Sequence, residues 1–183
     1  MCYNHPMAVK TPYPGGERAL QPLSPLSKKD EILALLESHG AAVEIHTNRE
    51  PEYADGFWDE DVILVGRNPH EGGGDVEIWL QDEFTLFFGG WHRHDFPYVA
   101  DYEDGFLANL RGFLDGTVFA AAAFGPDHWV ASQTFRADSL PRTREEALAG
   151  MRLHAEHRRM VESPGGRIEL ANWDPAKNVV FRW

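Results

Sequence analysis

Two histidines in the segment Trp91-His-Arg-His-Asp95 have a spacing that suits metal binding. Successive side chains of a β-strand point to opposite faces, so His92 and His94 share one face of an extended segment. Imidazole nitrogen is a common ligand for zinc and for related metals. One interpretation of the pair is therefore a zinc or manganese site, for which His154 is a candidate third ligand. Other candidates for that position are Asp95, His46 and His128.

A structural explanation of the same histidines is equally simple. His92 and His94 can lie at the end of a strand and bond to nearby carboxylates or backbone groups. A single His-x-His lacks the spacing of the established zinc motifs, and we favour this explanation. If a metal with an open coordination position is bound, the sequence indicates a metal-dependent hydrolase instead.

The single cysteine, Cys2, stands next to the initiator methionine. Removal of that methionine would leave an N-terminal thiol with its own amine as base, which is a known nucleophilic arrangement. The prolines that follow do not form the strand that such enzymes need, so we favour a free thiol on an N-terminal arm. One cysteine permits no internal disulfide, and no apolar signal segment begins the chain, so we expect a cytoplasmic protein.

An acidic stretch at residues 50–61 contains aromatic side chains between its carboxylates. Aromatic residues anchor many protein interfaces, and surrounding charges steer the approach of a partner. We therefore predict a partner-binding surface here, to which the nearby Asp101, Glu103 and Asp104 add charge. The alternative is a solvated acidic loop with a small apolar cluster beneath it. The predicted contact residues are Tyr53, Asp55, Phe57, Trp58, Asp59, Glu60 and Asp61.

The charge of the chain limits its partners. The formal net charge is −12, and residues 1–91 carry 16 acidic and 6 basic side chains. Such a surface repels nucleic acid and anionic membranes, and no apolar run is long enough to cross a bilayer. We expect a basic protein partner, with no nucleic acid and no membrane.

Residues 75–90 predict a β-hairpin with a defined register. A three-residue loop, Gln81-Asp82-Glu83, places six apolar residues of the two strands on one face, whereas a two-residue loop would divide them. If the strand continues without a bulge, His92 and His94 extend the buried face. A bulge at Gly89 and Gly90 would move both histidines to the other face, and the sequence leaves these alternatives open.

The remaining periodicities predict an α+β fold, an antiparallel sheet with helices mostly on one face. We expect a Pro-rich arm over residues 1–27 and a single domain over residues 28–183. Apolar spacing of 3.6 residues predicts helices at 28–38, 101–115 and 143–162, and a capping box of Thr143 with Glu146 begins the last of these. Strands within residues 41–96 and 117–136 are predicted to form the sheet. Two short final strands are predicted at 167–172 and 178–183.

The segment FTLFFGGWHRHDF resembles a strand of small bacterial families of immunity-type or uncharacterised proteins. In these families an apolar strand ends in Trp-His-x-His followed by an aromatic residue. The resemblance covers the central hairpin. It implies an immunity protein that has a cognate toxin and no catalytic activity. Together with the charge, it favours a non-catalytic acidic binding protein that neutralises a basic toxin, with the hydrolase as the alternative.

Overall fold

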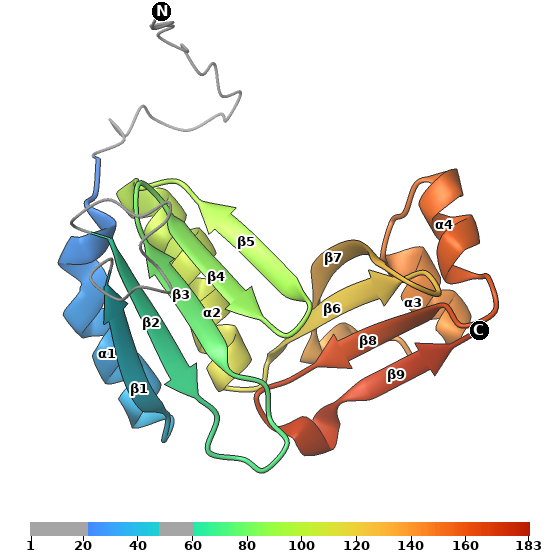
Figure 1. The fold of residues 1–183 in the computed structure, drawn as a ribbon, viewed down its shortest axis with the longest axis horizontal. Coiled ribbons are helices and arrows are strands. Elements are labelled where there is room, and N and C mark those ends of the chain that lie inside the picture. Colours follow the sequence, from blue (N-terminus) through green and yellow to red (C-terminus); the bar gives the residue numbers. More distant parts are fainter. Residues whose placement is uncertain (1–21, 48–60) are drawn as a thin grey trace, which may run out of the picture.

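The chain forms two antiparallel β-sheets with helices packed on them (Figure 1). This computed structural model describes residues 22–47 and 61–183. The predicted α+β class is confirmed, but the strands divide into two sheets instead of forming one. The prediction that helices cover one face of a single sheet therefore does not describe this fold.

The first sheet is a meander in which each strand pairs with the next one along the chain. The register predicted for the central hairpin is confirmed, because Leu80 pairs with Phe84 and Val76 pairs with Phe88. The strands in order are β1 (Ala42–Thr47), β2 (Val62–Arg67), β3 (Val76–Leu80), β4 (Phe84–Phe88) and β5 (Trp91–Asp95).

Gly89 and Gly90 form a tight turn, which corrects the prediction of a continuous or bulged strand to residue 96. Phe88 pairs directly with Trp91 across this turn. Gly89 has φ +58°, a conformation that glycine adopts without strain. Because the chain reverses after two residues, the odd-numbered residues of β5 face inward with Phe88. His92 consequently lies on the outer face, opposite to the face expected for a strand without a bulge.

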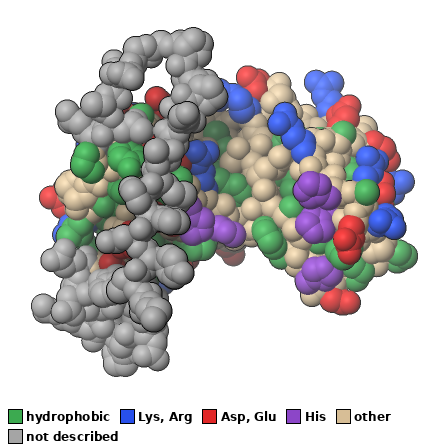
Figure 2. Space-filling model, turned by 90° about the horizontal axis from the view of Figure 1, so that it is seen from above, with side chains coloured by type: hydrophobic (Ala, Val, Ile, Leu, Met, Phe, Trp, Pro, Cys, Tyr) green, Lys and Arg blue, Asp and Glu red, His purple; other side chains and the backbone are tan. Residues whose placement is uncertain are grey.

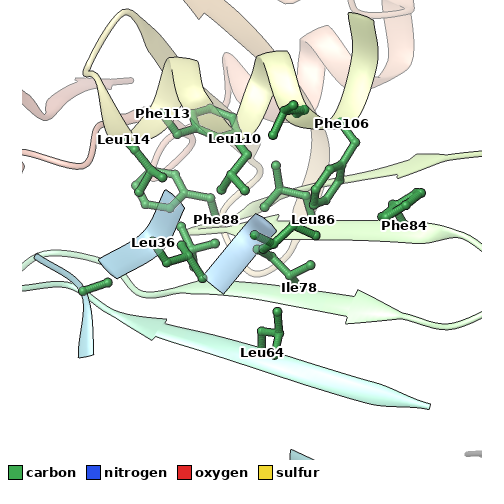
Figure 3. Packing of buried hydrophobic residues seen from close by; sticks show 14 of the residues in the cluster. Leu36, Leu64, Ile78, Phe84, Leu86, Phe88, Phe106, Leu110, Phe113 and Leu114 are labelled. Atoms are coloured by element: carbon green, nitrogen blue, oxygen red, sulfur yellow. The ribbon is translucent and has the colours of Figure 1, made fainter. Parts of the chain in front are cut away.

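Helices cover the inner face of the first sheet and form a core with large aromatic side chains. Phe106, Leu110 and Phe113 point from the helical segment toward Phe88 and Leu86 on the sheet (Figure 3). Phe88 and Phe113 stack with ring centroids 5.2 Å apart. The helical elements here are η1 (Pro25–Lys28), α1 (Lys29–Ser38), the π-helix η2 (Asp101–Leu107) and α2 (Ala108–Leu114).

The second sheet has the strand order β7-β6-β8-β9, so β6 pairs with a strand that follows two helices. A second core lies between this sheet and those helices. Its elements are β6 (Val118–Phe124), β7 (Trp129–Arg136), η3 (Ala137–Ser139), α3 (Arg144–Gly150), α4 (Ala155–Val161), β8 (Arg167–Ala171), η4 (Pro175–Lys177) and β9 (Val179–Arg182).

The predicted helix at 143–162 is two helices, and its prediction as one is wrong. The predicted cap is confirmed, since the Thr143 hydroxyl accepts a hydrogen bond from the Glu146 amide at 3.2 Å. The helix ends at Gly150, and Arg152 then adopts φ +50°, which stops helical backbone. A Cβ at Gly150 would lie 2.5 Å from the Phe135 ring, so this helix end packs closely on β7 and a larger residue would displace the ring.

Strand β6 contributes to both cores. Val118 and Ala120 belong to the core of the first sheet, while Phe119, Ala121 and Ala123 belong to the core of the second. Side chains alternate along a strand, so the two faces of β6 serve different cores. Strand β6 therefore takes part in both cores.

The last residues of the predicted N-terminal arm lie against the body. Pro22 forms a β-bridge with Tyr98, and the Leu23 amide donates a hydrogen bond to the Pro97 carbonyl. The earlier part of the arm, with Cys2, lies outside the described residues.

Candidate functional site

His92 and His94 project from the outer face of β5. His94 stands opposite Thr85 of β4, and His92 stands opposite Phe87. Both histidines are exposed. Their ring centroids are 5.4 Å apart, with the ring planes at 85°. The sequence prediction that both side chains share one face is consistent with this strand geometry, and the two rings are neighbours.

A carboxylate and a hydroxyl hold the His94 ring. Its Nδ1 lies 2.6 Å from Glu83 Oε1 and 3.1 Å from Thr85 Oγ1. Glu83 ends the three-residue loop between β3 and β4, while Thr85 is buried within β4. The carboxylate can only accept, so His94 Nδ1 is the donor in the contact with Glu83.

Aromatic rings fix the position of His92. Its ring stacks on Phe87 at 5.7 Å between centroids, and Trp129 of β7 lies 6.2 Å away on the second sheet. Trp129 is held in turn, because its Nε1 donates a hydrogen bond to the Gly90 carbonyl at 3.1 Å. The two sheets thus meet beside the histidine pair.

His154, the candidate third ligand, does not form a three-residue group with His92 and His94. It occupies the N-cap position of α4, among the helices of the second sheet, but its side chain makes no capping hydrogen bond. Its ring neighbours His157, with centroids 6.1 Å apart. Histidine side chains accordingly form separate groups on the face seen in Figure 2. Within residues 22–47 and 61–183, no three His, Cys, Asp or Glu side chains form a metal-binding group.

Most of the predicted partner-binding stretch lies outside the described residues, namely Tyr53, Asp55, Phe57, Trp58, Asp59 and Glu60. Asp61, the last of the set, is described and is 5% exposed. Its carboxylate accepts a hydrogen bond from Gln81 Nε2 at 3.1 Å. Asp61 therefore helps to hold the start of β2 against the β3–β4 loop.

An acidic surface with an exposed aromatic residue follows β5; we call residues 96–104 the acidic end of the first sheet. Phe96 is 65% exposed, and Val99 is 39% exposed. Glu103 and Asp104 are exposed on the first turns of η2, and Asp101 is partly exposed. The sequence contained the three carboxylates, but the exposure of Phe96 was not predicted. The sequence feature that could have indicated this exposure is Pro97, because a proline ends strand pairing and carries the chain away from the sheet.

Asp95 lies beneath this surface as a buried carboxylate. It is 3% exposed, and its Oδ1 accepts hydrogen bonds from Arg93 Nε and Nη2 at 2.7 Å. Burial raises the pKa of the Asp95 carboxyl, and the nearby charges of Asp101 and Glu83 add to the rise, while Arg93 opposes it. A Cβ at Gly105 would lie 2.5 Å from Asp95 Oδ1, so the π-helix η2 packs directly onto this pair.

Comparison with known proteins identified no relative. No family model matches the chain, no curated protein matches it, and no solved structure matches it. Among the described residues, no helix has both the length and the apolar character to cross a membrane.

Proposed function

We propose that this chain is a non-catalytic binding protein that docks a basic protein at the acidic end of its first sheet. In the finer form of the proposal, the partner is a basic toxin of nuclease type and the chain is its immunity protein. The contact stretch predicted from the sequence, residues 50–61, is a separate prediction, because only Asp61 of that stretch lies within the described residues.

The exposure of Phe96 beside carboxylates is the observation that carries the proposal. An aromatic side chain that is 65% exposed leaves apolar surface in water, and its burial by a partner is favourable. Asp101, Glu103 and Asp104 pair with no Lys, Arg or His among the described residues. A partner's Lys or Arg side chains are the complementary groups for such carboxylates.

The division of charge along the chain supports the same orientation. Residues 1–115 carry 21 acidic and 8 basic side chains, whereas residues 116–183 carry 8 acidic and 9 basic ones. The formal net charges are therefore −13 and +1. A basic partner is attracted to the part of the protein that holds the first sheet, and such attraction raises the association rate at low salt.

A pull-down from the organism that encodes the chain tests the proposal. Full-length protein is used as bait beside Phe96→Ala and a triple variant with Asp101→Lys, Glu103→Lys and Asp104→Lys. We expect a basic protein to bind the wild type and to be lost or strongly reduced with either variant. Association should also slow as salt is raised, since salt screens exposed charges.

Matched controls come from the second sheet. Val180→Ala is the control for Phe96→Ala, because Val180 on β9 is also exposed, at 45%. Charge reversal of the exposed Asp127, Asp138 and Glu156 is the control for the acidic triple variant. These controls should bind the partner as the wild type does. Loss of binding with the controls alone, or a partner that ignores both the Phe96 and the triple variant, contradicts the proposal. For the finer form, the captured protein must be toxic to cells that lack this chain.

A further inference from the structure

The geometry on the outer face of β5 points to a zinc-binding site made by two histidines, in which Glu83 orients one of them. The ligands are the imidazole nitrogens of His92 and His94, and water completes the coordination. This inference does not rest on the proposed binding function, because the site lies on the outer sheet face and the proposed partner contacts involve residues 96–104.

The distance between the two rings suits a shared metal ion. A zinc–nitrogen bond of about 2.1 Å places each imidazole centroid about 3.2 Å from the metal, so two ligands at a tetrahedral angle have centroids about 5.2 Å apart. The observed separation of His92 and His94 is 5.4 Å. The spacing of the two rings is therefore close to that of two histidine ligands on one ion.

The surroundings of His94 are those of a metal-binding histidine. Histidine ligands commonly donate the ring N–H that does not bind the metal to a carboxylate, which fixes the ring and strengthens the other nitrogen as a ligand. Glu83 Oε1 occupies this place, 2.6 Å from His94 Nδ1, and the buried Thr85 hydroxyl lies 3.1 Å from the same atom. Nε2 is then the metal ligand.

Packing orients His92 in a similar way. Its ring is stacked on Phe87 and faces Trp129, whose indole nitrogen is tied to the Gly90 carbonyl. A side chain held by aromatic contacts loses less conformational entropy when it binds a metal than a free one does. Because no third protein ligand joins the pair among the described residues, we expect modest affinity with two or more coordination positions filled by water.

Zinc titration by calorimetry tests the site. The protein is the full chain with Cys2→Ser, which removes the thiol as a competing ligand. We expect one saturable zinc site, with affinity at least tenfold weaker in His92→Ala and in His94→Ala. Glu83→Gln keeps both histidines but loses the charged acceptor, and a weakening of about tenfold is expected from the loss of such an orienting carboxylate.

The His154–His157 pair provides a matched control. These rings are 6.1 Å apart, but they lie on α4 and its cap, and no carboxylate is within hydrogen-bonding distance of either ring among the described contacts. His154→Ala and His157→Ala should leave zinc affinity unchanged, and thermal melting checks that every variant is folded. Absence of saturable binding, affinity that survives loss of both His92 and His94, or equal weakening by the control variants overturns the site. An unchanged affinity in Glu83→Gln overturns the orienting role.

Discussion

The two sheets differ in the side chains that fill their cores. The first sheet buries large aromatic residues, including Phe84, Phe88, Phe106 and Phe113, against its helices. In the second sheet, the central strand β6 carries four consecutive alanines that are at most 3% exposed. Small side chains on both faces let neighbouring elements approach β6 closely. Large aromatic contacts thus stabilise the first core, while in the second core Ala121 and Ala123 bring β6 close to its neighbours.

The same two regions differ at their surfaces. Carboxylates predominate in the part of the chain that forms the first sheet, and the exposed Phe96, His92 and His94 all belong to it. The second sheet contributes Trp129 at the junction and carries a nearly neutral charge. Both proposed sites therefore use the first sheet as their platform. Substitutions in the two cores can test how far this platform depends on the second sheet.

The largest effect is expected from Phe88→Ala in the first core. Phe88 is 1% exposed and stacks on Phe113, so its truncation leaves a cavity between the sheet and α2. We expect a loss of about 3–5 kcal/mol in the free energy of unfolding, measured by urea denaturation. The exposed Phe96→Ala is the control and should change stability by no more than about 0.5 kcal/mol. Similar losses for both variants would contradict the core described here.

Enlarging a residue of the second core should have the next largest effect. Ala121 is 0% exposed in β6 and packs in the second core. Ala121→Leu adds volume where none is free, and we expect destabilisation of about 1–3 kcal/mol by the same urea measurement. The control is Ala149→Leu on the exposed face of α3. If Ala121→Leu proved neutral or stabilising, the second core would have unfilled space and the contrast between the sheets would fail.

A pH-dependent difference is expected for Asp95→Asn. The pKa of Asp95 is raised from 3.8 by burial, so the folded protein holds this proton more tightly than the unfolded chain. The stability that Asp95 contributes is therefore greatest below pH 3.8 and declines as pH rises through the folded-state pKa. Asparagine does not titrate, so the stability of Asp95→Asn relative to the wild type should increase from about pH 3 to about pH 7. Urea denaturation across this pH range measures the difference in free energy of unfolding between Asp95→Asn and the wild type. A difference that does not change with pH would contradict the raised pKa of Asp95.

The smallest effect is expected at the start of α3. The Thr143 hydroxyl caps this helix, and the Glu146 carboxylate accepts a hydrogen bond from the Arg142 amide at 2.7 Å. Thr143→Ala should cost about 1 kcal/mol in the free energy of unfolding. Thr134→Ala, at an exposed position of β7, serves as the control. Equal effects of the two substitutions would mean that the cap does not stabilise the second sheet's helices.

Local patterns in the sequence predicted the register of the central hairpin. Only a three-residue loop puts Val76, Ile78 and Leu80 on one face with their partners, and burial of that face decides the register. The turn at Gly89 and Gly90 was not predicted, because paired glycines suit a bulge and a tight turn equally. Without that turn, the face of His92 could not be assigned.

Features set by distant contacts were beyond the sequence. The apolar spacing of residues 143–162 continues through Arg152, and the left-handed backbone there is invisible to periodicity. The division into two sheets was missed because β6 is apolar on both faces, which fits one sheet or two. The approach of Glu83 to His94 depends on the turn after β4, so the sequence predicted the histidine pair but not its carboxylate.

The strand order of the two sheets also has a consequence for the route of folding. Every strand of the first sheet pairs with its neighbour along the chain, so the contacts that build it close short loops. The second sheet cannot be completed in this way, because β6 must wait for β8, which follows β7 and two helices. During synthesis, we expect the histidine pair and the acidic end of the first sheet to be arranged before the last third of the chain has left the ribosome.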